Sequence, residues 1–77
     1  MKKLLEEIAL GLVEDKASVS VTEDEPDSEG VTVYHLHVAE GDMGRVIGKQ
    51  GKIAKAIRTV MRAAAGRNSK KIMVEID

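Results

Sequence analysis

Two stretches of the chain repeat apolar residues at the spacing of an amphipathic helix. The first predicts a helix over residues 2–15, with one apolar face made by Leu4, Leu5, Ile8, Ala9 and Leu12. Gly11 weakens this helix by about 1 kcal/mol relative to alanine. The second predicts a longer helix from about Gly51 to Ala65, whose apolar side is made by Ile53, Ile57, Val60, Met61 and Ala64. We therefore expect two helices with one apolar side each.

Three other stretches alternate apolar and polar residues with the period of two that is typical of β-strands. They cover residues 17–23, residues 31–38 and residues 72–76. In the middle stretch, the face that we assign to the core carries Tyr34, Leu36 and Val38. We therefore expect one strand directly after the first helix, a second strand near the middle of the chain, and a third strand that closes it.

The connections complete the order of elements. Residues 24–30 are acidic, contain the only proline and end in glycine, so they predict a solvated connection between two strands. Asp42 is positioned to cap a short helix that runs through Ile47, and Gly66 and Asn68 are suited to end the long helix. The expected order is helix, strand, strand, helix, helix, strand. This order predicts a single α+β domain over residues 1–77, with a three-stranded sheet packed on helices.

The size and composition of the chain exclude several classes of protein. A chain of 77 residues has room for one domain with a thin core, and without cysteine it has no disulfide framework. Glu6 and Glu7 interrupt the apolar run near the amino terminus, where a signal peptide needs about 7 to 15 uninterrupted apolar residues. No apolar run approaches the roughly 20 residues of a membrane-spanning helix. We expect a cytoplasmic protein that does not associate with membranes.

Charge is distributed unevenly along the chain although the net charge is only −1. Residues 1–42 contain 3 Lys or Arg against 11 Asp or Glu, whereas residues 43–77 contain 9 against 2. Such a division favours a positive field on one part of the surface and repulsion of a polyanion elsewhere. The simplest alternative is that the charges only keep the protein soluble.

The most distinctive motif lies in the basic part of the chain, where residues 46–53 read Val-Ile-Gly-Lys-Gln-Gly-Lys-Ile. Gly48 and Gly51 lack a Cβ, so the main chain there is able to take positive φ angles and to approach a ligand closely. The helix that follows directs unsatisfied N–H groups at whatever lies in the turn, and such groups suit a phosphate. The motif therefore predicts a nucleic-acid backbone clamp.

A basic stripe continues from this turn along the long helix, formed by Lys52, Lys55, Arg58 and Arg62. Most such stripes are simply the solvated face of a helix. The neighbouring glycine turn favours ligand binding for Lys52 and Lys55. For Arg58 and Arg62, which recede from the turn, the two interpretations stay open.

The Ile47-Gly48-Lys49-Gln50-Gly51 sequence, with Ile53 two places after the second glycine, resembles the motif of KH domains. About 26 residues follow the turn, enough for one helix and one strand, which resembles the type II, bacterial arrangement. The whole chain is similar to the small stand-alone KH proteins of the KhpA family. This resemblance implies single-stranded RNA binding, a homodimer, and association with a larger KH protein of the KhpB or Jag type. It also implies a role in post-transcriptional regulation or as an RNA chaperone.

The resemblance also implies roles for individual residues. Gly48 and Gly51 would permit close approach of the RNA backbone, while phosphate oxygens would be contacted by Lys49, Gln50 and Lys52. Arg45 and Lys55, each about one helical turn from the loop, would extend the contact. We assign Ile47 and Ile53 to the core, although the base groove is the alternative.

The chain also lacks one common means of binding single strands. It contains no Phe or Trp and only one Tyr, Tyr34, so base stacking on aromatic side chains cannot dominate. We therefore expect weak, salt-sensitive and sequence-tolerant RNA binding by a single copy.

Other motifs do not indicate a ligand-binding or catalytic site. Gly41-Asp42-Met43-Gly44 repeats the glycine spacing but carries an acid that would repel phosphate, and Gln50 stands where a P-loop needs Ser or Thr. His35 and His37 share a strand face, but a structural zinc site needs about four ligands. The sequence therefore predicts no catalytic residue, no metal site and no cofactor.

Two further functions stay open. The first is a protein-interaction or dimerisation module with little RNA affinity of its own, in which the helix surface around Met61 and Ala64 docks a partner. The second is binding of double-stranded DNA by the helix-turn-helix unit, which is less favoured because a glycine turn suits backbone contact better than base reading.

Overall fold

The structure is a computed structural model that describes residues 1–67 and 69–77. Its α-helices are α1 (Lys2–Leu10), α2 (Met43–Ile47) and α3 (Lys52–Gly66), and its strands are β1 (Ser20–Glu23), β2 (Val31–His37) and β3 (Lys71–Ile76). Three short 3-10 turns are η1 (Lys16–Ser18), η2 (Glu40–Asp42) and η3 (Lys49–Gly51). The predicted order of helices and strands in an α+β fold is confirmed. Asn68, predicted to help end the long helix, lies outside the described residues.

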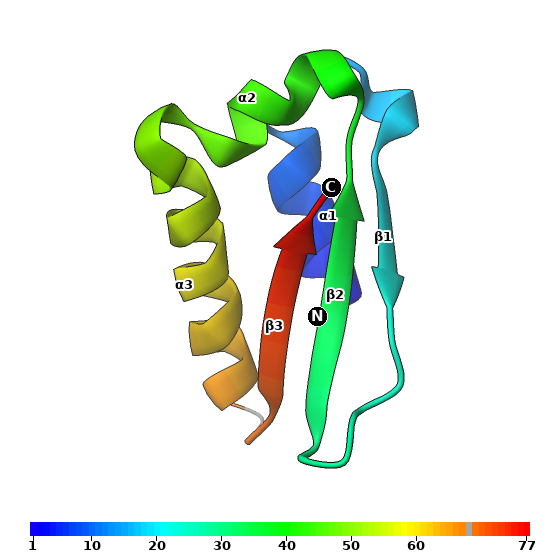
Figure 1. The fold of residues 1–77 in the computed structure, drawn as a ribbon, viewed down its shortest axis with the longest axis vertical. Coiled ribbons are helices and arrows are strands. Elements are labelled where there is room, and N and C mark those ends of the chain that lie inside the picture. The colour runs from blue at the N-terminus through cyan, green and yellow to red at the C-terminus, as the bar shows by residue number, and fades with distance from the viewer. Residues whose placement is uncertain (68) are drawn as a thin grey trace.

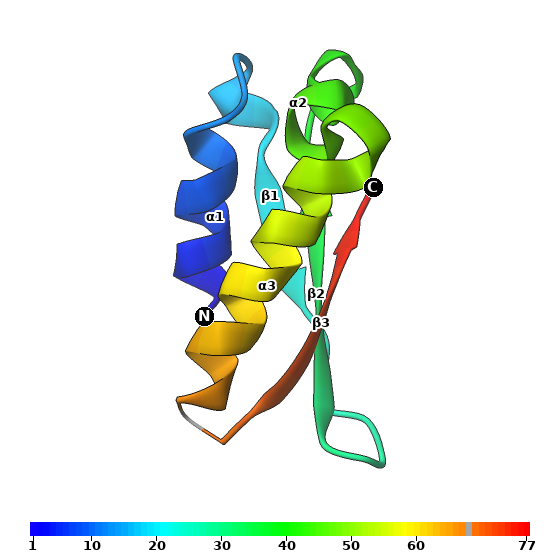
Figure 2. The ribbon, with the colours of Figure 1, turned by 90° about the vertical axis from the view of Figure 1, so that its left-hand side faces the viewer.

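The strands form one sheet in the order β1-β2-β3, with β2 in the centre (Figure 1). β1 pairs with β2 antiparallel, so that Val21 lies opposite Leu36. β3 pairs with β2 in parallel, so that Val74 lies opposite Tyr34. A parallel pair needs a long crossover connection, and here α2 and α3 supply it. Both α1 and α3 cover the same face of the sheet (Figure 2).

The core lies between the sheet and these helices. Its largest fully buried side chains are Leu5, Val38, Leu36, Val46 and Met61. The predicted core face of β2 is confirmed, since Tyr34, Leu36 and Val38 are all buried. No helix within residues 1–67 and 69–77 is long and apolar enough to cross a membrane.

The first helix is shorter than the sequence pattern predicts. α1 ends at Leu10 rather than at residue 15, and the backbone N–H groups of Glu14 and Asp15 donate to the side chain of Asp42 instead of continuing the helix. Val13 is nevertheless buried, because the turn that follows Gly11 carries it into the core. The strand predicted over residues 17–23 likewise begins only at Ser20, after η1.

The buried face of α3 is rotated from the predicted one. The face turned to the core is made by Ala54, Ile57, Met61 and Ala65. Val60, which we assigned to the apolar side, is 48% exposed, and Ile47, which we assigned to the core, is 36% exposed. Met61 is fully buried, so the alternative that it contributes to a partner-docking surface is wrong. Val60 therefore lies at the edge of the buried face of α3.

Candidate nucleic-acid interface

The glycine motif forms a sharp turn between α2 and α3. Gly48, Gln50 and Gly51 all have positive φ angles, of 75°, 58° and 76°. The turn is held by the N–H of Gly48, which donates to the carbonyl of Gly44, and by the N–H of Gly51, which donates to the carbonyl of Gly48. Three of the four residues from Gly48 to Gly51 thus have positive φ angles, and the loop projects from the end of the molecule where α3 begins (Figure 1).

The two glycines are required for different reasons. A Cβ on Gly48 would lie 2.5 Å from Cγ1 of Ile53, whereas a Cβ on Gly51 would meet nothing within 4 Å. Ile53 packs partly buried against the core, so Gly48 lets the loop fold down onto it. Within the fold, Gly51 is required by its left-handed backbone conformation (φ 76°, ψ 12°) at the start of α3.

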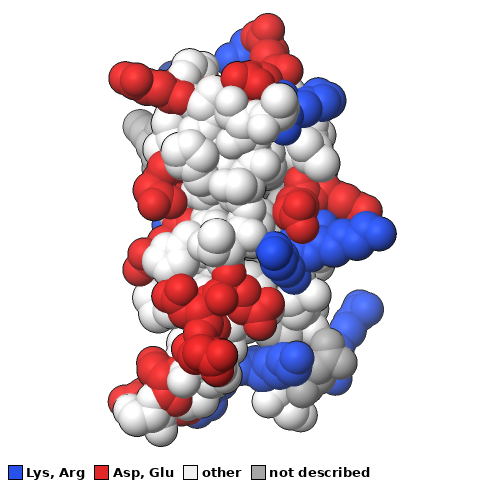
Figure 3. Space-filling model, turned by 90° about the vertical axis from the view of Figure 1, so that its right-hand side faces the viewer, with Lys and Arg blue, Asp and Glu red and all other residues white. Residues whose placement is uncertain are grey.

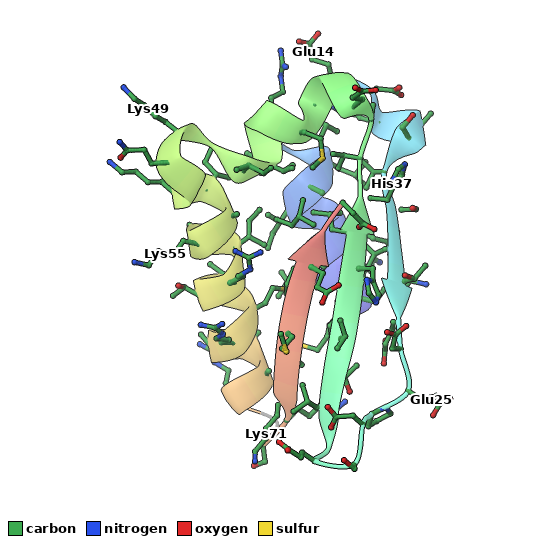
Figure 4. All side chains as sticks on the ribbon, viewed as in Figure 1. Glu14, Glu25, His37, Lys49, Lys55 and Lys71 are labelled. Carbon is green, nitrogen blue, oxygen red and sulfur yellow. The ribbon has the colours of Figure 1, made fainter. Side chains whose placement is uncertain are left out.

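The polar side chains around the turn face outward. Lys49, Gln50, Lys52 and Lys55 are all exposed, and Figure 4 shows Lys49 and Lys55 pointing away from the protein on the same side. None of the ion pairs among the described residues involves these three lysines. No side chain caps the first turn of α3. Since a helix N-terminus carries a partial positive charge, the surface combines exposed cations with a helix dipole and suits an anion.

Arg45 lies in a different electrostatic environment. Its guanidinium pairs with the carboxylate of Glu14 and lies 3.7 Å from Oδ1 of Asp42. Of the predicted contact residues, Arg45 is thus the one whose charge is already matched by the protein. Sequence analysis did not identify Glu14, because 31 residues separate it from Arg45 and no local pattern joins them.

Asp42 does not cap α2 as predicted. No side-chain bond caps that helix, and the buried carboxylate accepts hydrogen bonds from the N–H groups of Glu14 and Asp15 at 3.1 and 3.0 Å. These bonds, helped by the nearby Arg45 and opposed by burial, lower the pKa of Asp42 below its usual value. Asp42 therefore fastens the segment after α1 to the start of α2.

The other two residues of the basic stripe, Arg58 and Arg62, also differ in their environment. Arg58 donates from Nε to the carbonyl of Val74 at 3.2 Å, so it links α3 to β3. Arg62 is exposed one turn further along α3. The five predicted residues from Gly48 to Lys52 are therefore brought together in one loop, with Lys55 one turn beyond it.

The one aromatic residue is not available for stacking. Tyr34 is 3% exposed, and burial together with the charge of Glu23 raises the pKa of its hydroxyl. Its position in the core agrees with the expectation that aromatic stacking does not dominate binding.

On the outer face of the sheet, His35 is held by carboxylates from two sides. Its Nε2 lies 2.8 Å from Asp24 and its Nδ1 lies 3.4 Å from Glu75. The hydrogen bond to Asp24 is the main cause that raises the pKa of His35, with smaller contributions from Glu75 and Asp77. No group of three or more potential ligands suited to a metal ion occurs within residues 1–67 and 69–77.

Acidic side chains gather on the side of the molecule that carries β1 and the connection from β1 to β2 (Figure 3). This connection lies across the sheet from α3, as Figure 1 shows. The acids of this connection therefore lie far from the loop between α2 and α3 (Figure 1). A polyanion that approaches the loop between α2 and α3 stays away from the acidic connection.

Comparison with known proteins identifies similar chains. A family model described as "KhpA/KhpB, KH domain" matches residues 2–76. The chain is 53% identical over 76 residues to a protein of Clostridium acetobutylicum and covers 99% of both sequences. It is 47% identical to a protein of Listeria monocytogenes, with 99% of this chain and 97% of the relative covered. Both relatives are named "RNA-binding protein KhpA".

Two solved structures share the fold. One is Era of Aquifex aeolicus bound to GDP and aluminium fluoride, with a TM-score of 0.59 and 22% identity. The other is Era in complex with MgGDPNP and part of 16S ribosomal RNA, with a TM-score of 0.56 and 20% identity. The match covers 97% of this chain but only 28% of either Era chain, so the likeness concerns one domain of a longer protein.

Proposed function

Because the chain belongs to the KhpA/KhpB KH-domain family, we propose that it binds single-stranded RNA without catalysis and holds the RNA backbone at the loop of residues 48–51. The observation that carries this proposal is the glycine turn with its exposed cations. Lys49 lies within the turn whose residues Gly48, Gln50 and Gly51 have positive φ angles, and Lys52 follows it at the uncapped start of α3. Neither lysine takes part in an ion pair among the described residues, so both charges are available to a phosphate.

The loop acts as a backbone clamp. Gly48 and Gly51 keep the main chain bare of Cβ atoms, so a phosphate is able to approach the N–H groups of the turn. Lys49, Gln50 and Lys52 donate to phosphate oxygens, and Lys55 contacts the next phosphate along α3. A KH domain accommodates about four nucleotides in this manner.

Affinity for RNA is low and depends on salt. With Tyr34 buried, the domain lacks the aromatic platform that contributes roughly 1 to 3 kcal/mol per base in other single-strand binders. Charge contacts with phosphates then supply most of the affinity, and they weaken as salt competes for the backbone. Sequence preference is correspondingly small.

A salt titration with single-stranded RNA, single-stranded DNA and duplex DNA tests the ligand and the site together. The decisive variant combines Lys49→Asp and Gln50→Asp, which places two negative charges on the phosphate path. A matched control combines Lys3→Asp and Ser20→Asp, which makes the same change of charge at exposed positions on α1 and β1. We expect the loop variant to lose RNA binding while it stays folded by circular dichroism, and the control to retain most of it. Retained affinity in the folded loop variant would overturn the clamp.

A second copy of the chain is the partner that the apolar surface supports. A groove of about 370 Å³ between α1 and α3 is lined by Ile8, Leu12, Lys52, Ile53, Ala56, Ile57 and Val60. Lys52 is the one charged residue in this lining, so in a dimer its aliphatic part would be covered while its ammonium group stays at the rim for phosphate contact. In a dimer with a two-fold axis, each copy would cover this groove of the other copy, because an isologous contact uses the same patch on both subunits. The homodimer is thus part of the proposal, and a dimerisation module with little RNA affinity is the alternative.

The proposed cellular role is post-transcriptional regulation, or assistance to RNA folding, together with a larger KH protein of the KhpB type. Its support is the family match, which spans KhpA and KhpB domains. Copurification of the tagged chain with RNA and with such a protein, compared with the Lys49→Asp, Gln50→Asp variant, tests this role. The cytoplasmic location belongs to the same proposal.

A further inference from the structure

Arg45 is positioned near the loop but is paired with an acid that lies far away in the sequence. Arg45 belongs to α2, which leads directly into Gly48, so its guanidinium lies about one helical turn before the loop. Glu14 reaches it from the segment after α1. Figure 4 shows Glu14 and Lys49 at the same end of the molecule. The pair therefore borders the proposed path of the RNA backbone.

The two acids around Arg45 differ in how firmly they are held. The side chain of Asp42 is 5% exposed and is occupied by two backbone N–H groups. The side chain of Glu14 is 75% exposed, and its described side-chain partner is Arg45. Asp42 is thus fixed by the fold, whereas Glu14 is able to swing into solvent at low cost, as is typical of surface ion pairs.

Two carboxylates face the single guanidinium of Arg45. Arg45 contributes one positive charge, and Glu14 and Asp42 contribute two negative charges. A phosphate that approaches Arg45 therefore has to displace Glu14, because Asp42 is fixed by its backbone partners. Once Glu14 has left, the guanidinium is able to donate to the phosphate.

We propose that Glu14 competes with an RNA phosphate for the guanidinium of Arg45, so that Glu14 limits the affinity and the length of the RNA contact. This inference rests on the proposed function of the neighbouring loop. Lys49, Lys52 and Lys55 contact the backbone in every bound state, and Arg45 joins them only when the phosphate displaces Glu14. Glu14 is therefore a determinant of affinity that does not itself touch RNA.

The test compares Glu14→Gln with Glu25→Gln in salt titrations with a single-stranded RNA oligomer. Both variants remove one negative charge, but Glu25 lies in the connection between β1 and β2, far from Lys49 (Figure 4). We expect Glu14→Gln to bind RNA about two- to fivefold more tightly than Glu25→Gln, since an exposed ion pair contributes that much. Its salt dependence should steepen by about 0.7 in the slope of log K against log salt, equal to one added phosphate contact on a single strand.

The variant Arg45→Gln makes the test specific. If Glu14 acts through Arg45, then Glu14→Gln has no added effect when Arg45→Gln is present. Equal affinities of Glu14→Gln and Glu25→Gln would overturn the competition, and so would a gain that persists without Arg45. Both results leave the clamp intact as long as Lys49→Asp, Gln50→Asp abolishes binding, so failure of this inference is distinguishable from failure of the proposed function.

Discussion

Gly48 and Ile53 are packed so closely that a Cβ on the glycine would fall 2.5 Å from Cγ1 and 2.9 Å from Cβ of the isoleucine. The loop therefore rests on the first turn of α3 rather than standing free. Gly48 also has φ 75° and ψ 173°, a conformation that is open essentially to glycine alone. Both the backbone and the packing restrict this position to glycine, whereas only the backbone restricts Gly51.

Alanine substitutions should separate these two requirements. We expect Gly51→Ala to reduce the free energy of unfolding by about 1 to 2 kcal/mol, because alanine disfavours the left-handed conformation. Gly48→Ala should cost about 1 to 3 kcal/mol more, because its Cβ also overpacks against Ile53. Urea unfolding followed by circular dichroism measures both values.

Asparagine at the same positions provides a control, since it tolerates the left-handed region better than alanine. Gly51→Asn should therefore stay close to the wild type, and Gly48→Asn should not. Equal costs at the two positions would contradict the role assigned to the contact between Gly48 and Ile53.

The sequence pattern predicts the sheet and the loop well for a physical reason. Alternation along residues 31–38 assigns Leu36 to the core because successive side chains of a strand point to opposite faces. The turn at Gly48 and Gly51 is recognisable because its positive φ angles select glycine locally. In both cases, the information lies within a few neighbouring residues.

The features that the sequence did not predict depend on contacts between distant residues. Beyond the end of α1, the N–H of Glu14 donates to Asp42, which lies 28 positions away. Arg45 is neutralised by an acid 31 positions away. The exposure of Val60 depends on how α3 is rotated about its axis against the sheet. Helical periodicity alone does not decide which of two neighbouring residues faces the core.

Asp42 should make the stability of the domain dependent on acid. Its pKa is lowered in the folded state by the N–H groups of Glu14 and Asp15, so its contribution is complete above the unfolded-state pKa near 3.8 and is lost as the pH falls through the lower folded value. Asp42→Asn should unfold at lower urea concentration than the wild type at pH 7. Below about pH 5, the variant should lose less further stability than the wild type does. Glu40→Gln, an exposed acid two residues away, serves as control, and parallel pH profiles of wild type and Asp42→Asn would contradict this role.

His35 should make the stability of the domain depend on pH in the opposite sense to Asp42. The hydrogen bond to Asp24 raises the pKa of His35, so the protonated ring stabilises the fold below the unfolded value of 6.5, and this contribution is lost as the pH rises through the higher folded value. Proton NMR of the histidine rings should show the pKa of His35 falling toward 6.5 in Asp24→Asn. An unchanged titration of His35 in that variant would show that Asp24 does not hold the ring in solution.

Val60 should control the association of two copies. It is 48% exposed at the margin of the apolar groove between α1 and α3, and a carboxylate there would be buried without a partner in the proposed homodimer. We expect sedimentation velocity to show Val60→Glu as a folded monomer at concentrations where the wild type is a dimer. Met73→Glu is the matched control, because Met73 is 51% exposed on β3 and is absent from the groove lining. A wild type that stays monomeric at every concentration would defeat the homodimer, and a dimeric Val60→Glu would move the interface to another surface.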